Sequence, residues 1–154
     1  MTDKLEKLMP KLYILTYALG SSYVVIGAVP YLGALETAGA ADSLDQGLKL
    51  PLLLLSGVIL VVSASLRSLL LKVMTKTRKD SASAYLGIFL NAHIITLAIR
   101  ESGVILAFVW SVISGEKDWA AIAAGIAVAI TVLQIPTRKM VEEIIPPELR
   151  KEGL

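Results

Sequence analysis

Cysteine is absent from this chain, and histidine occurs once, as His93. Without cysteine there can be no disulfide, thiolate catalysis, iron–sulfur cluster or cysteine-based zinc site. His93 alone cannot provide both axial ligands of a bis-histidine haem. The chain also has no evident nucleophile or nucleotide-binding loop. We therefore expect no cofactor, no metal site and no enzymatic activity.

Charged residues are also scarce. They make up 18% of the 154 residues, against 55% hydrophobic, and the mean hydropathy is +0.70. A soluble domain carries nearer to about a quarter charged residues. Here the charges are gathered in short segments between long apolar runs, as expected where lipid is the main solvent. No basic face with interleaved aromatic residues occurs, so nucleic acid is not an expected partner.

Four apolar segments are candidates for membrane-spanning helices: residues 12–35, 50–71, 84–113 and 119–135. Crossing about 30 Å of hydrocarbon takes about 20 residues at a rise of about 1.5 Å each. The fourth segment is slightly short, whereas the third is long enough that it must tilt, kink or protrude. The sequence therefore predicts an all-α polytopic protein, a single four-helix transmembrane bundle over residues 1–154. No extramembrane domain is expected, and Pro146–Pro147 interrupts the C-terminal tail.

Local signals mark the ends of three of these segments. Pro51 fits the first turn of the second helix, where its missing N–H costs nothing. Asp80 or Ser81 is expected to cap the third helix, and Gly115 follows its end. Asp118 is expected to cap the start of the fourth helix.

Lysine and arginine are distributed unequally between the two sets of loops. Eleven flank the segments on the side of the termini, whereas Lys49 and Lys117 are the two on the other side. Cytoplasmic loops carry such an excess of basic residues, so both termini are predicted to be cytoplasmic. The first eleven residues mix acids with lysines and are interpreted as a mature start rather than a signal peptide. The bacterial inner membrane is the expected location.

Arg100 and Glu101 form an adjacent charged pair near the middle of the third apolar segment. Each would cost several kcal/mol or more against lipid, so each must face protein, water or the other. At about 100° per residue, His93, Thr96 and Arg100 share one stripe of the helix, and Asn91 lies opposite. Glu101 is about 100° away from Arg100, so partners from elsewhere are expected.

Two interpretations of these polar residues stay open. In the first, they form a polar clamp between helices. In the second, Glu101 carries a proton or cation, because a low-dielectric site disfavours the charged carboxylate. Arg100 would then tune the carboxyl group or attract an anion. Asn91, His93 and Thr96 would line a cytoplasmic access path.

Arg67, on the second segment, is predicted at a depth comparable to His93. Its expected behaviour is to extend toward the lipid headgroups, which we favour over a catalytic role. His93 could act as a pH-sensitive relay. His93 and Glu101 do not share a helix face, so no metal site is predicted there.

The fourth segment contains a ladder of small residues, Ala121, Gly125 and Ala129, at four-residue spacing. Such faces let helix backbones approach closely, within a chain or between subunits. A second ladder lies beside it, formed by Ala123, Ala127 and Thr131. Two such faces on one helix make association of several copies an expectation.

The segment from Ala98 to Trp110, AIRESGVILAFVW, resembles the carboxylate-bearing helix of rotary ATPase proteolipid subunits. Those helices place an acid in mid-membrane, followed by small and then bulky apolar residues. The resemblance covers about 20 of the 154 residues. It implies an ion-carrying role for Glu101.

The function predicted first is that of a non-enzymatic membrane component, either an accessory subunit or a small oligomeric assembly. The alternative is a proton- or cation-coupled transporter or channel with Glu101 as the carrier. The expected partners are the lipid bilayer and either further copies of the chain or a larger membrane complex.

Overall fold

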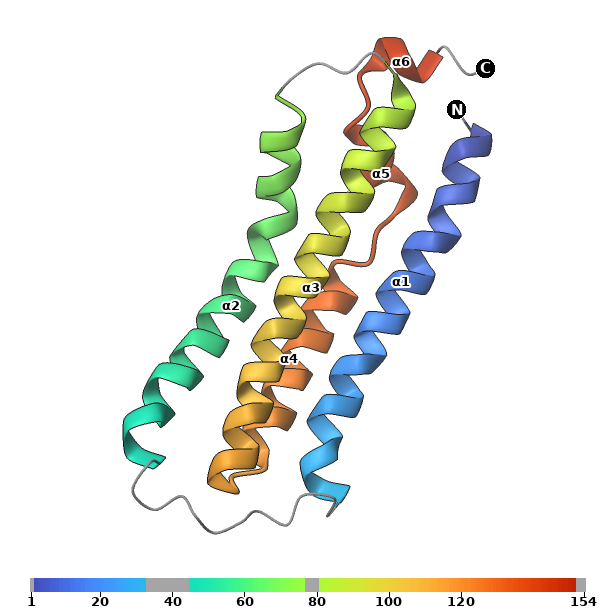
Figure 1. Cartoon of the computed structure of the whole chain (residues 1–154). Helices are drawn as coiled ribbons and strands as arrows, with labels where there is room; N and C mark the ends of the chain where they lie inside the picture. The colour runs from blue at the N-terminus through green and yellow to red at the C-terminus, as the bar shows by residue number, and fades with distance from the viewer. Residues whose placement is uncertain (1, 33–44, 77–80, 152–154) are drawn as a thin grey trace.

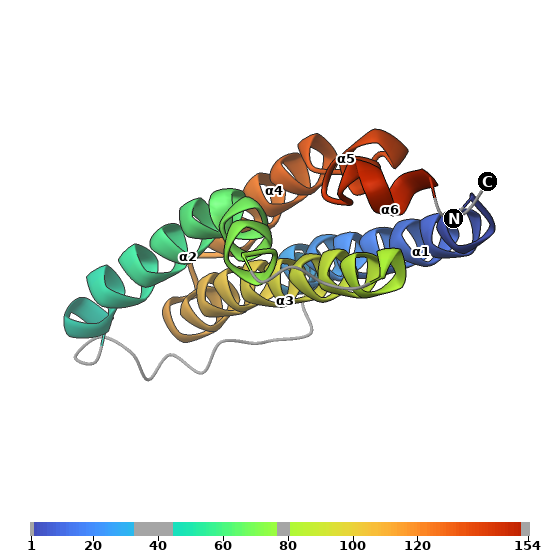
Figure 2. The same cartoon turned by 90° about the horizontal axis from the view of Figure 1, so that it is seen from above.

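The computed structural model describes residues 2–32, 45–76 and 81–151, and all regular structure within these ranges is helical. Helices α1 to α4 form an elongated bundle, and both termini lie at the same end, here called the terminal end (Figure 1). The central helix α3 packs against α1, α2 and α4, an arrangement that Figure 2 shows from above. The elements are α1 (Thr2–Ala28), a short 3-10 helix η1 (Val29–Leu32), α2 (Asp45–Met74), α3 (Ala82–Ser114), α4 (Asp118–Leu133), α5 (Arg138–Glu143) and α6 (Pro147–Lys151).

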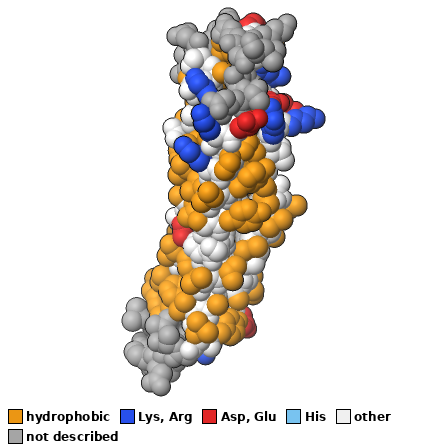
Figure 3. Space-filling view, turned by 90° about the vertical axis from the view of Figure 1, so that its right-hand side faces the viewer, with side chains coloured by type: hydrophobic (Ala, Val, Ile, Leu, Met, Phe, Trp, Pro, Cys, Tyr) orange, Lys and Arg blue, Asp and Glu red, His pale blue; other side chains and the backbone are white. Residues whose placement is uncertain are grey.

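Within the described residues, three helical segments are long and apolar enough to cross a membrane: Lys4–Leu32, Gly47–Met74 and Ala82–Ser114. Their outer faces expose large hydrophobic side chains such as Val61, which is 73% exposed. Figure 3 shows a broad apolar band, with Lys and Arg side chains gathered toward the terminal end. Apolar surface of this extent is typical of a protein that lies in lipid. The fold is therefore compatible with a small membrane protein.

Two helices begin earlier than their apolar segments indicate. Helix α1 begins at Thr2, because Leu5 and Leu12 continue its buried face through the charged N-terminal turns. Helix α2 begins at Asp45, so Pro51 lies inside the helix rather than in its first turn. The prediction for Pro51 was wrong, because the polar residues before it also adopt helical structure. The expected end of the first helix, residues 33–35, lies outside the described residues.

Helix α3 has the ends that its flanking residues indicate. The side chain of Ser81 accepts a hydrogen bond from the Ala84 amide, which satisfies one free donor of the first turn. Gly115 has a φ of 72°, the left-handed conformation that closes many helices. The other candidate cap, Asp80, lies outside the described residues.

Helix α4 differs from its predicted form at both ends. Asp118 is its first residue rather than its cap, and its carboxylate accepts a hydrogen bond of 2.5 Å from the Tyr31 hydroxyl. The helix ends at Leu133, two residues before the predicted limit. Pro136 explains this end, because a proline disfavours helical conformation in the residue before it. At about 1.5 Å per residue, α4 is only about 24 Å long.

The tail after α4 continues along the bundle to the terminal end (Figure 1). Helix α5 is capped by Thr137, whose side chain accepts from the Met140 amide. Apolar residues of α5 and α6 join the first turns of α1 and α3 in one core, made of Leu5, Leu12, Tyr85, Leu86, Phe89, Val141, Ile145 and Leu149. A second core lies further along the bundle and takes residues from each of α1, α2, α3 and α4. It is made of Tyr23, Leu60, Val104, Ala107, Ala123, Ala124 and Ala127.

Candidate functional site

A polar cluster lies where α2 and α3 meet the end of α4, and its centre is Arg100, which is 1% exposed. Its Nε donates to the Ser63 hydroxyl at 3.2 Å, and its Nη1 donates to the Thr131 hydroxyl at 2.7 Å. Its Nη2 donates to the side-chain oxygen of Gln134 at 2.6 Å. The partners of Arg100 therefore come from α2 and from the end of α4, not from the adjacent Glu101.

Arg67 joins the same cluster from α2. It is 7% exposed, and its Nη1 donates to the backbone oxygen of Gln134 at 2.7 Å. Its guanidinium lies 5.8 Å from the centre of the Phe89 ring, within the range of a cation–π contact. The expectation that Arg67 extends toward the headgroups was wrong. We call Arg67, Arg100, Ser63, Thr131 and Gln134 the arginine clamp.

The arginine clamp lies at the C-terminal end of α4, and this position explains why two positively charged side chains gather there. The last carbonyl groups of a helix lack intrahelical partners, and the helix dipole places partial negative charge there. Within lipid such groups need partners from the protein itself. Arg67 supplies one to the Gln134 carbonyl, while the Gln134 amide donates to the Ala64 carbonyl on α2. Among the described residues, neither Arg67 nor Arg100 forms an ion pair with a carboxylate.

His93 connects α3 to α1 instead of joining the clamp. Its Nε2 lies 2.8 Å from the Thr16 hydroxyl, and that hydroxyl donates to the Leu12 carbonyl at 2.7 Å. When the single hydroxyl proton of Thr16 is donated to Leu12, Nε2 of His93 is the donor in their contact. The ring also stacks against Phe89, with centroids 6.4 Å apart. His93 is thereby held in one orientation.

Glu101 lies on a different side of α3, half-buried against α1. Its Oε1 is 2.9 Å from the hydroxyl of Ser22, which also lies 2.7 Å from the Leu19 carbonyl. The Ser22 hydroxyl donates to this carboxylate oxygen, so the contact joins α1 to α3.

The other two candidates of α3 do not join these contacts. Thr96 is buried, and its hydroxyl donates to the Ala92 carbonyl of its own helix at 2.7 Å. Asn91 is exposed on the surface of α3. The sequence-predicted polar residues are thus distributed over four places: the clamp, the contacts between α1 and α3, the interior of α3 for Thr96 and the outer surface for Asn91.

The first ladder of α4 is not its inner packing face. Gly125 and Ala129 are exposed, whereas Ala124 is buried against Gly27 of α1. A Cβ atom built on Gly27 would lie 2.6 Å from the Cβ of Ala124, so the two helices touch there. The second ladder, which includes Thr131, is buried. The Ala121–Gly125–Ala129 face is open to a further partner.

A second polar cluster, which the sequence interpretation missed, joins α2 to the loop between α3 and α4. Glu116 accepts hydrogen bonds from Lys49 at 2.8 Å, from Trp119 at 2.7 Å and from Trp110 at 3.3 Å. The bond from Lys49, followed by those from the two indoles, lowers the pKa of Glu116 below its ordinary value. The sequence signal for this cluster was the position of Glu116 between Trp110 and Trp119. The residues Lys49, Trp110, Glu116 and Trp119 are called the glutamate tether.

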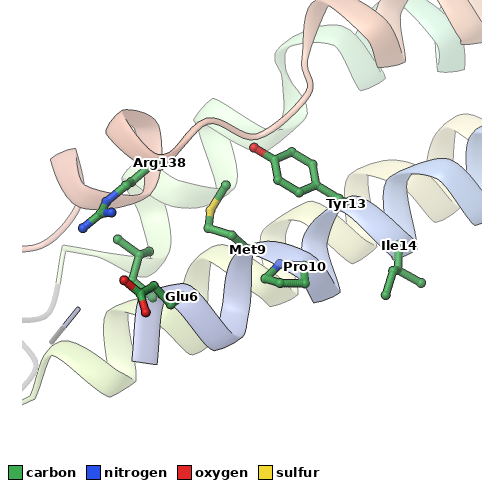
Figure 4. A pocket seen from close by; sticks show the side chains of 7 residues that line it. Glu6, Met9, Pro10, Tyr13, Ile14 and Arg138 are labelled. Atoms are coloured by element: carbon green, nitrogen blue, oxygen red, sulfur yellow. The ribbon is translucent and has the colours of Figure 1, made fainter. Parts of the chain in front are cut away.

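Surface cavities lie mainly beside α1. The one in Figure 4 has a volume of about 510 Å³ between α1 and α5, with an apolar floor that includes Met9 and Tyr13. Glu6 and Arg138 lie on its rim, as the close view shows. Within the described part of the chain, no group of three or more His, Asp or Glu side chains is placed to hold a metal ion.

Fold and site together define a class: a small all-helical protein with three helices long and apolar enough to cross a membrane. Several of its buried polar side chains, among them Arg67, Arg100 and His93, hydrogen-bond between helices. Comparison with known proteins finds no matching family model and no significantly similar curated protein or solved structure. The likeness of the Glu101 segment to proteolipid subunits is therefore a local resemblance.

Proposed function

We propose that the protein is a non-enzymatic component of the bacterial inner membrane, either an accessory subunit or a self-associating assembly. It crosses the membrane four times, with both termini in the cytoplasm. The fourth crossing is the shortest, because α4 is only about 24 Å long. The excess of lysine and arginine on the side of the termini supports this orientation.

The arginine clamp is the observation that carries this proposal. Charged residues inside a membrane protein mark a functional pathway by default. Here, however, Arg100 makes its hydrogen bonds with neutral oxygens of Ser63, Thr131 and Gln134. Those bonds connect the C-terminal end of α4 to α2 and α3. Arg100 therefore stabilises the bundle, and this role does not require a transported ion.

The contact between Glu101 and Ser22 favours a second function, that of a proton- or cation-coupled transporter or channel. Glu101 is a half-buried carboxyl group in the middle of α3, and an ionisable side chain at such a depth is a candidate ion carrier. His93 would then lie between Glu101 and the terminal end on α3, but its own hydrogen bond with Thr16 is already made.

Proton flux in proteoliposomes separates the two functions. Wild type and Glu101→Gln are reconstituted at equal density, and flux is followed under an imposed pH gradient. We expect no flux above that of empty liposomes from either protein, with equal assembly by size-exclusion chromatography. Wild-type flux that disappears in Glu101→Gln would overturn the structural role and establish the second function.

The orientation can be measured because the chain contains no cysteine. Lys117→Cys and Lys139→Cys each place one thiol at an exposed position, at opposite ends of the bundle. In intact cells, a membrane-impermeant maleimide should label the first variant, and the second only after lysis. The reverse pattern would show that the termini are outside.

A further inference from the structure

A groove of about 390 Å³ runs between the first turns of α1 and α3. Lys4, Lys7 and Lys11 line it from α1, with spacings of three and four residues that place them on one helix face. Leu86, Gly87 and Leu90 of α3 are among the residues opposite. We call this space the lysine groove.

Its two sides have different chemistry. The Lys4 and Lys11 side chains are exposed, so their ammonium groups can reach a ligand while their methylene stems follow the apolar wall. The α3 side is apolar apart from Ser83, and nothing lies within 4 Å of a Cβ atom built on Gly87. Gly87 therefore leaves the groove open between the leucines. A ligand that fits must be negatively charged at one end and apolar along its length.

We propose that the lysine groove binds one anionic phospholipid, with its phosphate between Lys4 and Lys11 and an acyl chain along α3. The groove lies at the terminal end, where Figure 3 shows basic side chains next to the apolar band. Lipid headgroups meet acyl chains at such a boundary. The binding holds for an accessory subunit and for a transporter alike, so it does not depend on the function proposed above.

The other cavities lack this combination of charge and apolar surface. The cavity of Figure 4 has both Glu6 and Arg138 on its rim, so its charges oppose each other. The two grooves between α1 and α4 are lined by uncharged residues, among them Thr16, Gly20 and Thr131 in one. Among the cavities described, the lysine groove has the strongest single-sign charge.

The test is native mass spectrometry of the full chain in detergent, titrated with phosphatidylglycerol. Wild type should bind one lipid with saturation. Lys4 and Lys11 should each contribute about fivefold, so Lys4→Gln/Lys11→Gln should weaken the affinity about 25-fold. Gly87→Leu keeps all three charges but fills the groove, and it should weaken the affinity about tenfold. Phosphatidylcholine with the same acyl chains should bind weakly to all three proteins.

The matched control is Lys72→Gln/Lys76→Gln, which removes two exposed lysines of the same end of the molecule outside the groove. It should bind phosphatidylglycerol within about twofold of wild type. An equal loss in this control, or an unchanged affinity in Gly87→Leu, would show diffuse attraction and overturn the proposal. Equally tight binding of phosphatidylcholine, or competition by inorganic phosphate at the same concentration, would also overturn it.

Discussion

The Nη2 atom of Arg100 lies 2.6 Å from the side-chain oxygen of Gln134, the residue that directly follows α4. The backbone oxygen of the same glutamine receives a hydrogen bond from Arg67. Two buried guanidinium groups thus converge on one helix end. Their positive charge lies where the helix dipole is negative, which lowers the cost of burying them.

Loss of the clamp should destabilise the protein strongly. Arg100→Ala removes the hydrogen bonds to Ser63, Thr131 and Gln134, leaving buried oxygens without a donor. We expect a loss of about 3 kcal/mol of unfolding free energy, measured by denaturant titration in detergent micelles. Arg138→Ala is the control, because its ion pair with Glu142 is on the surface and should contribute less than about 1 kcal/mol. Equal stability of the two variants would contradict the assigned role of Arg100.

The Thr16 hydroxyl should be required for the orientation of His93. Thr16→Val keeps the shape of the side chain but leaves the buried Nε2–H without its acceptor, which should cost about 1–3 kcal/mol. Thr16→Ser restores the hydroxyl and should recover most of this loss. Thermal unfolding of the two variants in the same detergent gives the comparison. A valine variant as stable as the serine variant would show that the contact contributes nothing.

Gly27 and Gly125 should respond in opposite ways to the same substitution. Gly27→Ala places a methyl group 2.6 Å from the Cβ of Ala124, so α1 and α4 must separate at a cost of about 1–3 kcal/mol. Gly125→Ala meets no atom within 4 Å and should be neutral or stabilising by up to about 1 kcal/mol. Unfolding in detergent micelles measures the stability of both variants.

If the Ala121–Gly125–Ala129 face joins copies, Gly125→Leu should lower the oligomeric fraction in cross-linking without unfolding the chain.

The glutamate tether should weaken in acid. Because the folded-state pKa of Glu116 is lowered, its contribution is present above the ordinary carboxyl pKa and is lost as pH falls through the folded value. Both tryptophans of the chain donate to this carboxylate, so their fluorescence reports its protonation. Wild-type emission should shift with a midpoint below the ordinary pKa of a glutamate side chain. In Glu116→Gln the transition should be absent, and its persistence there would assign it to another group.

Local features of the helices were predictable because they depend on neighbours in the chain. The apolar segments around α2 and α3 were recognised from hydropathy alone, and Ser81 and Gly115 were recognised from capping preferences. The outer ends were less predictable. Thr2 and Asp45 begin helices within charged segments, since polar residues also adopt helical structure when the buried face continues.

The candidate residues of α3 were recognised, but their partners were not. Arg100 and Glu101 were identified as an adjacent pair, but their side chains hydrogen-bond to different parts of the bundle, Gln134 after α4 and Ser22 of α1. Gln134 and Ser63 were overlooked, because a single glutamine or serine in an apolar segment carries no distinctive pattern. Pro136 was the sequence signal that could have shown the early end of α4 and the need for donors there.

The amino-acid sequence by itself determined the helices, the apolar character of three of them and the unequal distribution of lysine and arginine. Tertiary structure decided which polar groups meet. The contacts of Thr16 with His93, of Ser22 with Glu101 and of Arg100 with Thr131 span 77, 79 and 31 residues of chain. Hydropathy and capping act over a few residues, whereas a hydrogen bond requires two atoms within about 3 Å, wherever they lie in the chain. Only the packing of α1, α2 and α4 around α3 brings those atoms together.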